Sequence, residues 1–497
     1  MTLIPLDIPA GFYRNGTELE QSNRWRDGSL VRWRDNSLRP VGGWTERKVG
    51  FSSSPVRGMH TWEDLGGTAW VAGGSHDELI AMTGSGLTYD ITPSGLAAGR
   101  VDAAVETGYG YGFYGLGFYG QPIQQLSTAV PAEATTWNLD NWGEYLVACH
   151  YDDGRLLEWD LDTSGIAAPI ANAPTNNLGL VVTEERFLFA LGAGNNPRKV
   201  QWCDQENNTL WAPAATNQAG DIELQTSGQI MQGVRTRGQT LIITDTDAHS
   251  ARYQGPPFVY GFERVGTSCG AVSRKSAADV DIGVFWMGQR GFFRFDGNSV
   301  GEIPCDVHDY VFNDLNRAQQ SKIWAFANGQ FGEIWWFYPS EGSLEIDRYV
   351  AYDYKENHWL IGELSRTAGV ERGVFRYPFL AGYHNSATDI YEHEVGFNVD
   401  DASIFAETGP ISLGAGDQIA RVISLIPDEI SQGDVDVTFK TRFYPNGTET
   451  THGPYTPNNP TSVRFSGRQF RMRVDGAKLG PWRVGNMRVD ALAGGRR

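Results

Sequence analysis

Short apolar runs, each followed by a turn and then by an aromatic residue beside an acid, recur along most of the chain. One example is Tyr145–Cys149, which is followed by Asp153-Gly154 and then by Trp159-Asp160. Short runs that are apolar at every position are typical of strands buried on both faces, and Gly, Asn and Asp are typical of tight turns. Each unit therefore predicts a β-hairpin whose first strand lies between stacked sheets.

This hairpin pattern occurs seven times. Its aromatic end residues are Tyr89, Trp159, Trp202, Tyr253, Phe295, Tyr352 and Tyr391. Repeats of about 40 to 50 residues with four strands each are typical of a β-propeller. The alternative is a β-sandwich followed by another β domain, but the aromatic-acid endings recur too often for a sandwich. We therefore expect an all-β fold with a propeller of six or seven blades.

The pattern differs at the two ends of the chain. We expect an extended N-terminal docking segment rich in Arg and Trp over residues 1–50, and a propeller over residues 51–398. After about residue 400, period-two alternation such as Arg471–Val474 predicts a small antiparallel β domain over 399–497, with a basic end. One helix is expected over residues 307–319, with Asp306 as its N-cap.

An insertion at about residues 102–136 contains a stretch in which Gly alternates with aromatic residues. No Lys follows it and it opens no helix, so it is not a phosphate-binding loop. Two interpretations remain: a loop that becomes ordered against a neighbouring subunit, and a locally packed hairpin. For the first interpretation the candidate interface residues are Tyr109, Tyr111, Phe113, Tyr114, Phe118 and Tyr119.

Composition supports a turn-rich β protein and shows an uneven charge. The 497 residues include 60 Gly and 60 Phe, Trp or Tyr, which argues against helical bundles and disorder. The net charge of −18 makes whole-chain affinity for nucleic acid unexpected. Residues 1–50 carry 8 basic and 6 acidic side chains and residues 461–497 carry 9 and 2, whereas the rest carries 24 and 51. The chain is therefore an acidic body between two basic ends.

Several kinds of chemistry are not indicated. The four cysteines form no CxxC pair, so we expect buried free thiols, and the nine histidines form no HExxH motif. No metal or cofactor site is predicted. There is no visible secretory signal and no apolar run long enough to span a bilayer, so we expect a protein without a membrane span that is made in a cytoplasm.

The nearest approach to a catalytic motif is Gly266-Thr267-Ser268-Cys269-Gly270, which matches the G-x-S-x-G nucleophile elbow. That elbow needs a buried parallel strand before it and a helix after it. Polar residues with little helical periodicity follow here, so a simple turn is the better interpretation. We therefore expect no enzymatic activity.

The Arg- and Trp-rich stretch over residues 24–44 is a candidate interface. Trp and Arg are enriched at interface hot spots, and alternating Arg and Trp could also stack nucleotide bases. The interleaved acids favour a protein partner. The candidate subunit or adaptor interface residues are Arg24, Trp25, Arg26, Arg32, Trp33, Arg34 and Trp44.

The chain resembles the tail hub, or nozzle, proteins of short-tailed bacteriophages, also called packaged-DNA stabilisation proteins. The resemblance rests on several motifs across residues 10–395 and is loose after that. These motifs are Gly11–Thr17, Arg39–Trp44, Leu87–Pro93, Val182–Phe187, Val284–Gly288 with Phe295–Gly297, and Asp309–Asn316. None of them is catalytic.

The resemblance implies a structural virion protein in a phage tail. Six copies would form a ring that continues the channel below the portal and the adaptor, or head-to-tail connector. The ring would retain the packaged DNA and conduct it during ejection. An acidic wall would let double-stranded DNA pass without sequence-specific binding, while the basic ends could dock onto the adaptor or onto tail fibres. The alternatives are a receptor-binding adhesin of the tail-fibre type and a polysaccharide-active propeller enzyme.

Overall fold

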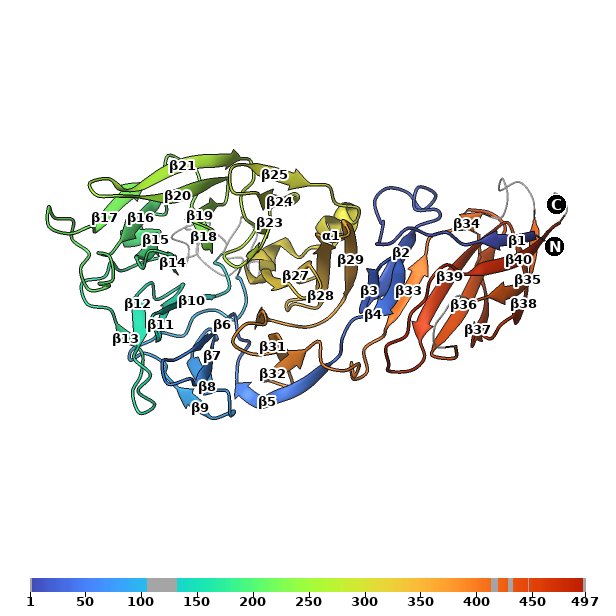
Figure 1. The fold of residues 1–497 in the computed structure, drawn as a ribbon, viewed down its shortest axis with the longest axis horizontal. Coiled ribbons are helices and arrows are strands. Elements are labelled where there is room, and N and C mark those ends of the chain that lie inside the picture. The colour runs from blue at the N-terminus through green and yellow to red at the C-terminus, as the bar shows by residue number, and fades with distance from the viewer. Residues whose placement is uncertain (1, 105–131, 413–418, 428–431, 446, 495–497) are drawn as a thin grey trace, which may run out of the picture.

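The computed structural model describes residues 2–104, 132–412, 419–427, 432–445 and 447–494. It is an all-β protein of elongated shape, with a larger propeller-like region at one end and a smaller β region at the other (Figure 1). The first and last strands, β1 (Thr2–Pro5) and β40 (Arg488–Ala493), lie at the far end of the smaller region (Figure 1). We call these parts the propeller-like region and the second β region.

Within the described residues, seven four-stranded antiparallel sheets follow one another and build the propeller-like region. The first four are β6–β9 (Gly58–Glu63, Ala69–Gly74, Leu79–Thr83, Thr88–Asp90), β10–β13 (Trp137–Trp142, Tyr145–His150, Leu156–Trp159, Ala168–Pro169), β14–β17 (Gly179–Val182, Leu188–Leu191, Lys199–Trp202, Gly220–Glu223) and β18–β21 (Ile230–Thr236, Gln239–Thr244, Asp247–Gly255, Val259–Thr267). The other three are β22–β25 (Ala277–Val280, Gly283–Met287, Phe292–Phe295, Val300–Ile303), β26–β29 (Trp324–Asn328, Glu333–Tyr338, Arg348–Asp353, His358–Glu363) and β30–β32 with β5 (Ala368–Val370, Phe379–His384, Ala387–His393, Trp44–Ser52).

Adjacent sheets meet through their first strands. These strands lie next to one another in the order β6, β10, β14, β18, β22, β26 and β30, and β30 in turn lies against β6. The second strand of each sheet is almost entirely buried, as in β27, where all six residues are buried. This burial explains why the second strands are apolar on both faces, because sheets pack against both sides of them.

The predicted hairpins are confirmed as strand pairs, with one exception. In six sheets the apolar run is the second strand and the aromatic end residue lies on the third, as in β11 and β12, where Leu146 pairs with Trp159. In the first sheet the end residue Tyr89 lies instead on the fourth strand, β9, opposite Ala81 of β8.

The last sheet is completed by an early segment of the chain. Strand β5 pairs with β32, with Trp44 opposite His393 and Thr45 opposite Glu392. The predicted boundary between residues 50 and 51 therefore lies within a strand of the propeller-like region.

The second β region also combines the two ends of the chain. One sheet has the order β1 (Thr2–Pro5), β40 (Arg488–Ala493), β35 (Ala420–Ile426) and β38 (Thr461–Gly467). The other has the order β2 (Trp25–Ser29), β33 (Phe405–Thr408), β39 (Gln469–Gly476), β36 (Val435–Arg442) and β37 (Thr450–Tyr455), with β34 (Ile411–Ser412) paired to β39. The sheets share an apolar core, in which the rings of Phe439 and Phe465 lie 4.9 Å apart.

The helices of the described chain are short. The helix α1 covers His308–Asp314, and 3₁₀ turns cover Ala193–Asn195 (η1) and Arg317–Lys322 (η2). The prediction of one helix over 307–319 is therefore too long, because the backbone is extended at Leu315 (φ −72°, ψ 125°). Its N-cap is Val307 rather than Asp306, and no side chain caps it.

The G-x-S-x-G match lies in a turn, as the sequence indicates. Thr267 ends β21, which is antiparallel to β20, and Ser268 has a φ of 57°. A β-bridge between Ala271 and Gly288 follows this turn, and the described chain has no helix between the turn and α1.

All four cysteines are free, and burial raises the pKa of Cys149 to about 12.

Close contact between the first two sheets depends on glycines beside Trp137. A Cβ atom at Gly74 would lie 2.3 Å from Cδ1 of Trp137, and one at Gly58 would lie 2.5 Å from the Trp137 carbonyl oxygen. The indole of Trp137 is fully buried and donates to the Ser75 carbonyl at 2.5 Å. There is no room for a methyl group at either glycine.

We predict that Gly74→Ala lowers the free energy of unfolding by about 1–3 kcal/mol, the usual cost of overpacking a core. The control is Gly301→Ala in β25, where an added Cβ meets no atom within 4 Å and a change below about 0.5 kcal/mol is expected. Urea unfolding followed by Trp fluorescence measures both. Equal effects of the two substitutions would contradict the packing argument.

Candidate functional site

Residues 10–43, which we call the linking segment, lie between the two regions of the molecule. On the propeller side, the Phe12 amide donates to the Trp359 carbonyl at 2.8 Å and the Leu30 amide donates to the Tyr349 hydroxyl at 2.9 Å. On the other side, Leu38 and Val484 exchange backbone hydrogen bonds of 2.8 and 3.0 Å. The segment includes β2 and the hairpin of β3 (Val31–Arg34) and β4 (Ser37–Pro40). It holds the regions together.

Arg32 of this segment is the centre of a buried ion cluster. Its guanidinium lies 2.9 Å from Glu333 in β27 and 2.5 Å from Glu394, just after β32. The three side chains are 3%, 0% and 6% exposed. The Phe331 ring covers the guanidinium, with its centroid 3.7 Å from Cζ of Arg32.

Both carboxylates receive further hydrogen bonds. Glu333 accepts from the Trp335 indole at 2.9 Å, and Glu394 accepts from Asn328 Nδ2 at 2.9 Å and from the Gly42 amide at 3.0 Å. Burial raises the pKa of Glu333, although the Arg32 charge opposes the shift. Burial by itself would lower the pKa of Arg32, but the two glutamates raise it, so the arginine stays charged.

The three tryptophans predicted as interface residues are buried within this chain. The Phe12 ring meets Trp33 edge-on at 5.0 Å, and the Trp25 ring lies 5.8 Å from Trp33. The Trp44 indole donates to Asp400 at 2.7 Å. These side chains pack the junction between the two regions and present little surface to another molecule.

The predicted interface arginines also have partners in the chain. Arg26 pairs with Glu18 at 2.9 Å, and Arg34 lies 3.6 Å from Asp353. Arg24 is exposed, with its guanidinium 5.6 Å from the ring centroid of the nearby Tyr13. The six aromatic candidates of the insertion, from Tyr109 to Tyr119, lie outside the described residues.

Two cavities flank the linking segment, and neither of them was predicted from the sequence. A polar cavity of about 440 Å³ lies between Arg14, Tyr310, Arg348 and Asp401. A second cavity, of about 320 Å³, is lined by the β3–β4 hairpin and by Trp482 and Arg483 of the second β region. Clefts between regions of a chain are common ligand sites. No sequence motif marks them, because their walls come from segments far apart in the sequence.

Polar side chains also lie on or next to the first strands of the propeller-like region. His60 Nε2 lies 3.2 Å from Asn141 Oδ1, and Val182 donates its amide to Asp140 at 2.9 Å. Burial lowers the pKa of His60, and Asp140 opposes this. Burial lowers the pKa of Lys275 to about 8. In the described part of the chain no three His, Cys, Asp or Glu side chains form a metal-ligand group.

The chain matches no protein-family model and no curated protein. Similar solved structures exist. Virginiamycin B lyase from Staphylococcus aureus covers 70% of this chain and 98% of its own, with 8% identity and a TM-score of 0.43. PorZ, a surface component of the type-IX secretion system of Porphyromonas gingivalis, covers 85% and 46%, with 7% identity and a TM-score of 0.38. A luciferin-regenerating enzyme covers 53% and 91%, with 7% identity and a TM-score of 0.34.

These neighbours correct one prediction. The sequence led us to expect a protein that is not an enzyme, but the similar structures include a lyase and a luciferin-regenerating enzyme. The prediction that the chain is not an enzyme is therefore wrong, since similar folds occur in enzymes. At 7–8% identity the neighbours indicate no particular substrate for this chain. No helix in the described ranges has the length and apolar character required to cross a membrane.

We predict that Arg32→Met lowers the free energy of unfolding by about 3–5 kcal/mol, because it leaves two buried carboxylates without their cation. Adding Glu333→Gln and Glu394→Gln to this variant should recover part of the loss, since the uncompensated charges are then gone. Urea unfolding measures the series, with the exposed Arg421→Met as control. A loss no greater than that of the control would contradict a central role for the ion cluster.

A second prediction concerns Asp279 of β22 and Glu371, which follows β30. Both side chains are solvent-accessible, but the protein atoms around them desolvate their carboxylates: this raises the pKa of Asp279 to about 6, and the same effect together with the Asp279 charge raises that of Glu371 to about 7. Because these values exceed those of the unfolded chain, the folded protein binds extra protons between about pH 4 and 7, and its stability falls as the pH rises through that interval.

The double variant Asp279→Asn/Glu371→Gln should therefore be slightly more stable than the wild type at pH 8, a small gain because water screens these accessible carboxylates, and the difference should shrink toward pH 4. Urea unfolding across this range provides the test. The double variant Glu63→Gln/Glu341→Gln, at two exposed acids elsewhere, is the control. A stability difference that does not change with pH would refute the predicted proton uptake.

Proposed function

We propose that this chain is a structural subunit of a short phage tail, a hub or nozzle protein that forms a ring continuing the portal–adaptor channel. In this proposal the seven sheets are the blades of a seven-bladed propeller, and the second β region is a docking domain. The ring, a hexamer, would retain packaged DNA in the virion and conduct it during ejection. The protein would be made in the host bacterial cytoplasm.

The observation that carries this proposal is the position of the basic C-terminal segment, at the end of the molecule that lies away from the acidic propeller-like region. Strand β1 pairs with β40, Thr2 facing Ala491, so the N- and C-terminal segments share one sheet at the end of the molecule (Figure 1). The acidic residues are concentrated in the segments that build the propeller-like region. The molecule thus has an acidic body and a basic docking end. In the proposed ring the acidic body would face the DNA and the basic end would face the adaptor.

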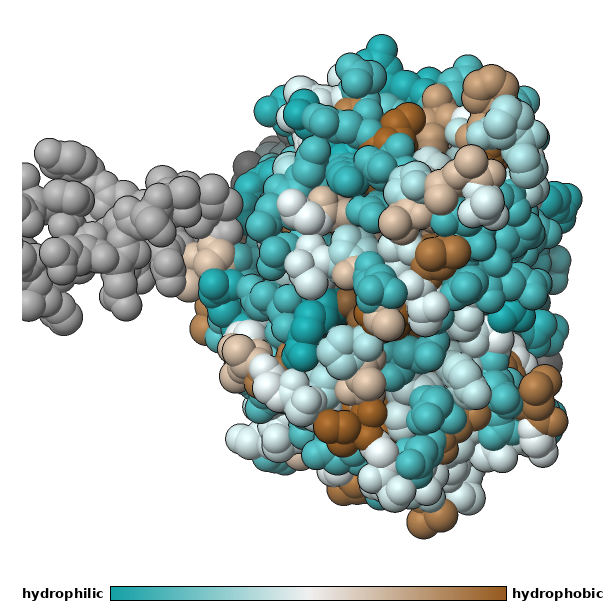
Figure 2. Space-filling model, turned by 90° about the vertical axis from the view of Figure 1, so that its left-hand side faces the viewer, coloured by the Kyte–Doolittle hydropathy of each residue, from teal (hydrophilic) through white to brown (hydrophobic). Residues whose placement is uncertain are grey.

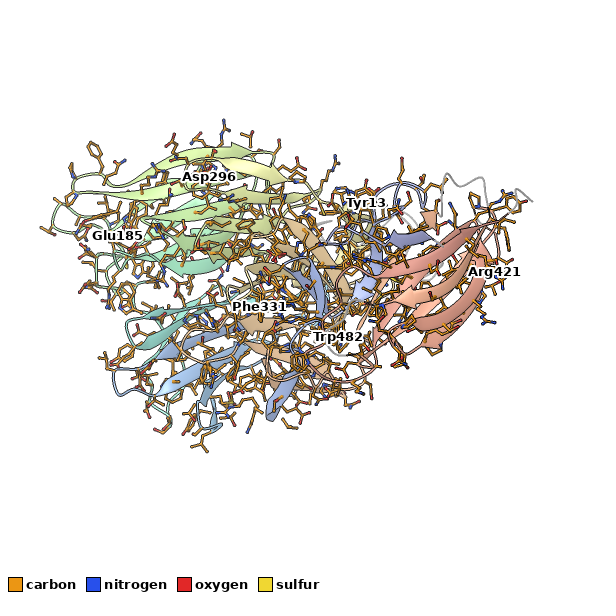
Figure 3. All side chains as sticks on the ribbon, turned by 45° about the vertical axis from the view of Figure 1, so that its right-hand side comes forward. Tyr13, Glu185, Asp296, Phe331, Arg421 and Trp482 are labelled. Carbon is orange, nitrogen blue, oxygen red and sulfur yellow. The ribbon has the colours of Figure 1, made fainter. Side chains whose placement is uncertain are left out.

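The outer face of this sheet is a docking surface of suitable charge, which we call the basic sheet face. It carries the exposed Arg421 of β35, Arg464 of β38 and Arg488 of β40, whereas Val422 and Phe465 point into the core. Figure 3 shows Arg421 at the outer edge of the second β region. The exposed Leu3 and Leu492 lie on the same sheet. Arginines around apolar side chains suit an acidic adaptor surface.

The opposite end of the molecule differs in character. Its visible surface is mostly hydrophilic, with apolar residues scattered singly (Figure 2). Scattered apolar groups of this kind need no partner. In the proposal, the adaptor therefore contacts the basic sheet face and not this end.

We predict that the purified chain forms rings of six copies, alone or after its adaptor is added. Charge reversal of Arg421, Arg464 and Arg488 to Glu should abolish adaptor binding while the protein stays folded, because exposed side chains contribute little to stability. Mass photometry and negative-stain microscopy measure assembly, and circular dichroism checks the fold.

The control reverses three exposed arginines elsewhere, Arg290, Arg317 and Arg376. Monomers in every condition with the adaptor present would refute the proposal. Trimers that adsorb to host cells would instead favour the receptor-binding adhesin, and turnover in a polysaccharide screen would favour the propeller enzyme.

A further inference from the structure

The cavity of about 320 Å³ beside the linking segment has a distinctive lining. Its walls come from the β3–β4 hairpin, from the turn at Phe331, from the loop after β32 and from the Pro481–Arg483 loop of the second β region. Figure 3 shows Phe331 and Trp482 in the central part of the molecule, where the two regions meet. The cavity volume lies at the lower end of the range for small-molecule sites.

The cavity is cationic. Four arginines line it, Arg32, Arg34, Arg39 and Arg483, against a single carboxylate, Glu394. The oxygens of Glu394 are already engaged by Arg32, Asn328 and Gly42. Outside the lining, Arg34 lies 3.6 Å from Asp353 and Arg39 lies 3.4 Å from the exposed Asp35, whereas Arg483 has no carboxylate partner in the described chain.

These three arginines have unused donors. Buried Nη2 of Arg34 and Nε of Arg39 have no hydrogen-bond acceptor among the described residues. The other contacts of Arg39 are long, 3.3 Å to the Arg34 carbonyl and 3.4 Å to Asp35. Arg483 is exposed at the cavity and has no carboxylate partner in the described chain. A buried donor without an acceptor is costly, so an anion in the cavity would be stabilised.

Mutual repulsion of the arginines supports the same conclusion. Partial burial, together with the charges of Arg483 and Arg34, lowers the pKa of Arg39, although Asp35 opposes the shift. A doubly charged anion would relieve this repulsion. Phosphate fits better than carboxylate, because its three terminal oxygens can each accept from one arginine fork.

The remaining walls are apolar and mostly flat. Phe397, Trp482, Pro40 and Pro481 line the cavity beside the arginines, and one face of Phe331 is covered by Arg32. Trp482 is itself fully buried, so Phe397 is the aromatic ring that a ligand could contact, and an aromatic ring next to a cationic site suits a planar ring attached to a phosphate. We propose that this cavity binds a nucleoside monophosphate, with its phosphate between Arg34, Arg39 and Arg483 and its base against the half-buried ring of Phe397.

Calorimetric titration of the full chain with AMP, GMP, CMP and TMP tests the proposal, with adenosine and inorganic phosphate as partial ligands. At least one monophosphate should bind, and adenosine should bind at least about tenfold more weakly than AMP, because it lacks the charge-assisted hydrogen bonds. No binding of any monophosphate at millimolar concentration, or equal affinity for adenosine and AMP, would overturn the proposal.

Two variants assign the parts of the site. Arg483→Gln should weaken monophosphate binding at least about tenfold, whereas the matched exposed control Arg488→Gln should leave it unchanged. Phe397→Ala should weaken monophosphate binding but leave that of inorganic phosphate unchanged, since only the base contacts the ring. Thermal unfolding verifies that each variant is folded. Equal binding by Arg483→Gln and Arg488→Gln would overturn the assignment of the phosphate site.

Discussion

The arrangement of this molecule depends on one buried cation. Arg32 lies on the linking segment, while its partners Glu333 and Glu394 belong to two neighbouring sheets of the propeller-like region. Removing Arg32 would leave two carboxylates away from water without their cation, so the three positions are strongly coupled. The coupling fixes the linking segment against the propeller-like region. Because the same segment carries β2 and exchanges hydrogen bonds with Val484, it also fixes the second β region.

Local patterns were sufficient to predict the hairpins but not their connections. The all-apolar run Ile334–Tyr338 could be read as a strand buried on both faces, because burial acts on every residue of such a strand. The pairing of Trp44 with His393 could not be read in this way, because a short strand of mixed polarity carries no signal of its distant partner. For that reason the sequence-based boundary cut through β5.

The Arg- and Trp-rich stretch shows a similar limit. These residues were predicted to contact a subunit or an adaptor, whereas Trp25, Trp33 and Arg32 are buried between two surfaces within the chain. Both surfaces belong to the same chain, which composition cannot show. The cavity at Arg34, Arg39 and Arg483 had no sequence signal either, because Arg483 is brought there only by the folding of the second β region against the linking segment.

The closure of the last sheet by β5 has a consequence for the order of folding. During synthesis Trp44–Ser52 leaves the ribosome early, but its partner strand Ala387–His393 follows only after all the intervening sheets have been made. Strand β1 waits longer still, until Arg488–Ala493 is complete. Contacts between such distant segments form slowly, and an unpaired strand edge invites association with other chains. A growing chain of this protein therefore carries β5 unpaired until residue 393 and β1 unpaired almost to the end of translation, and premature termination anywhere before residue 387 would leave both strands without partners.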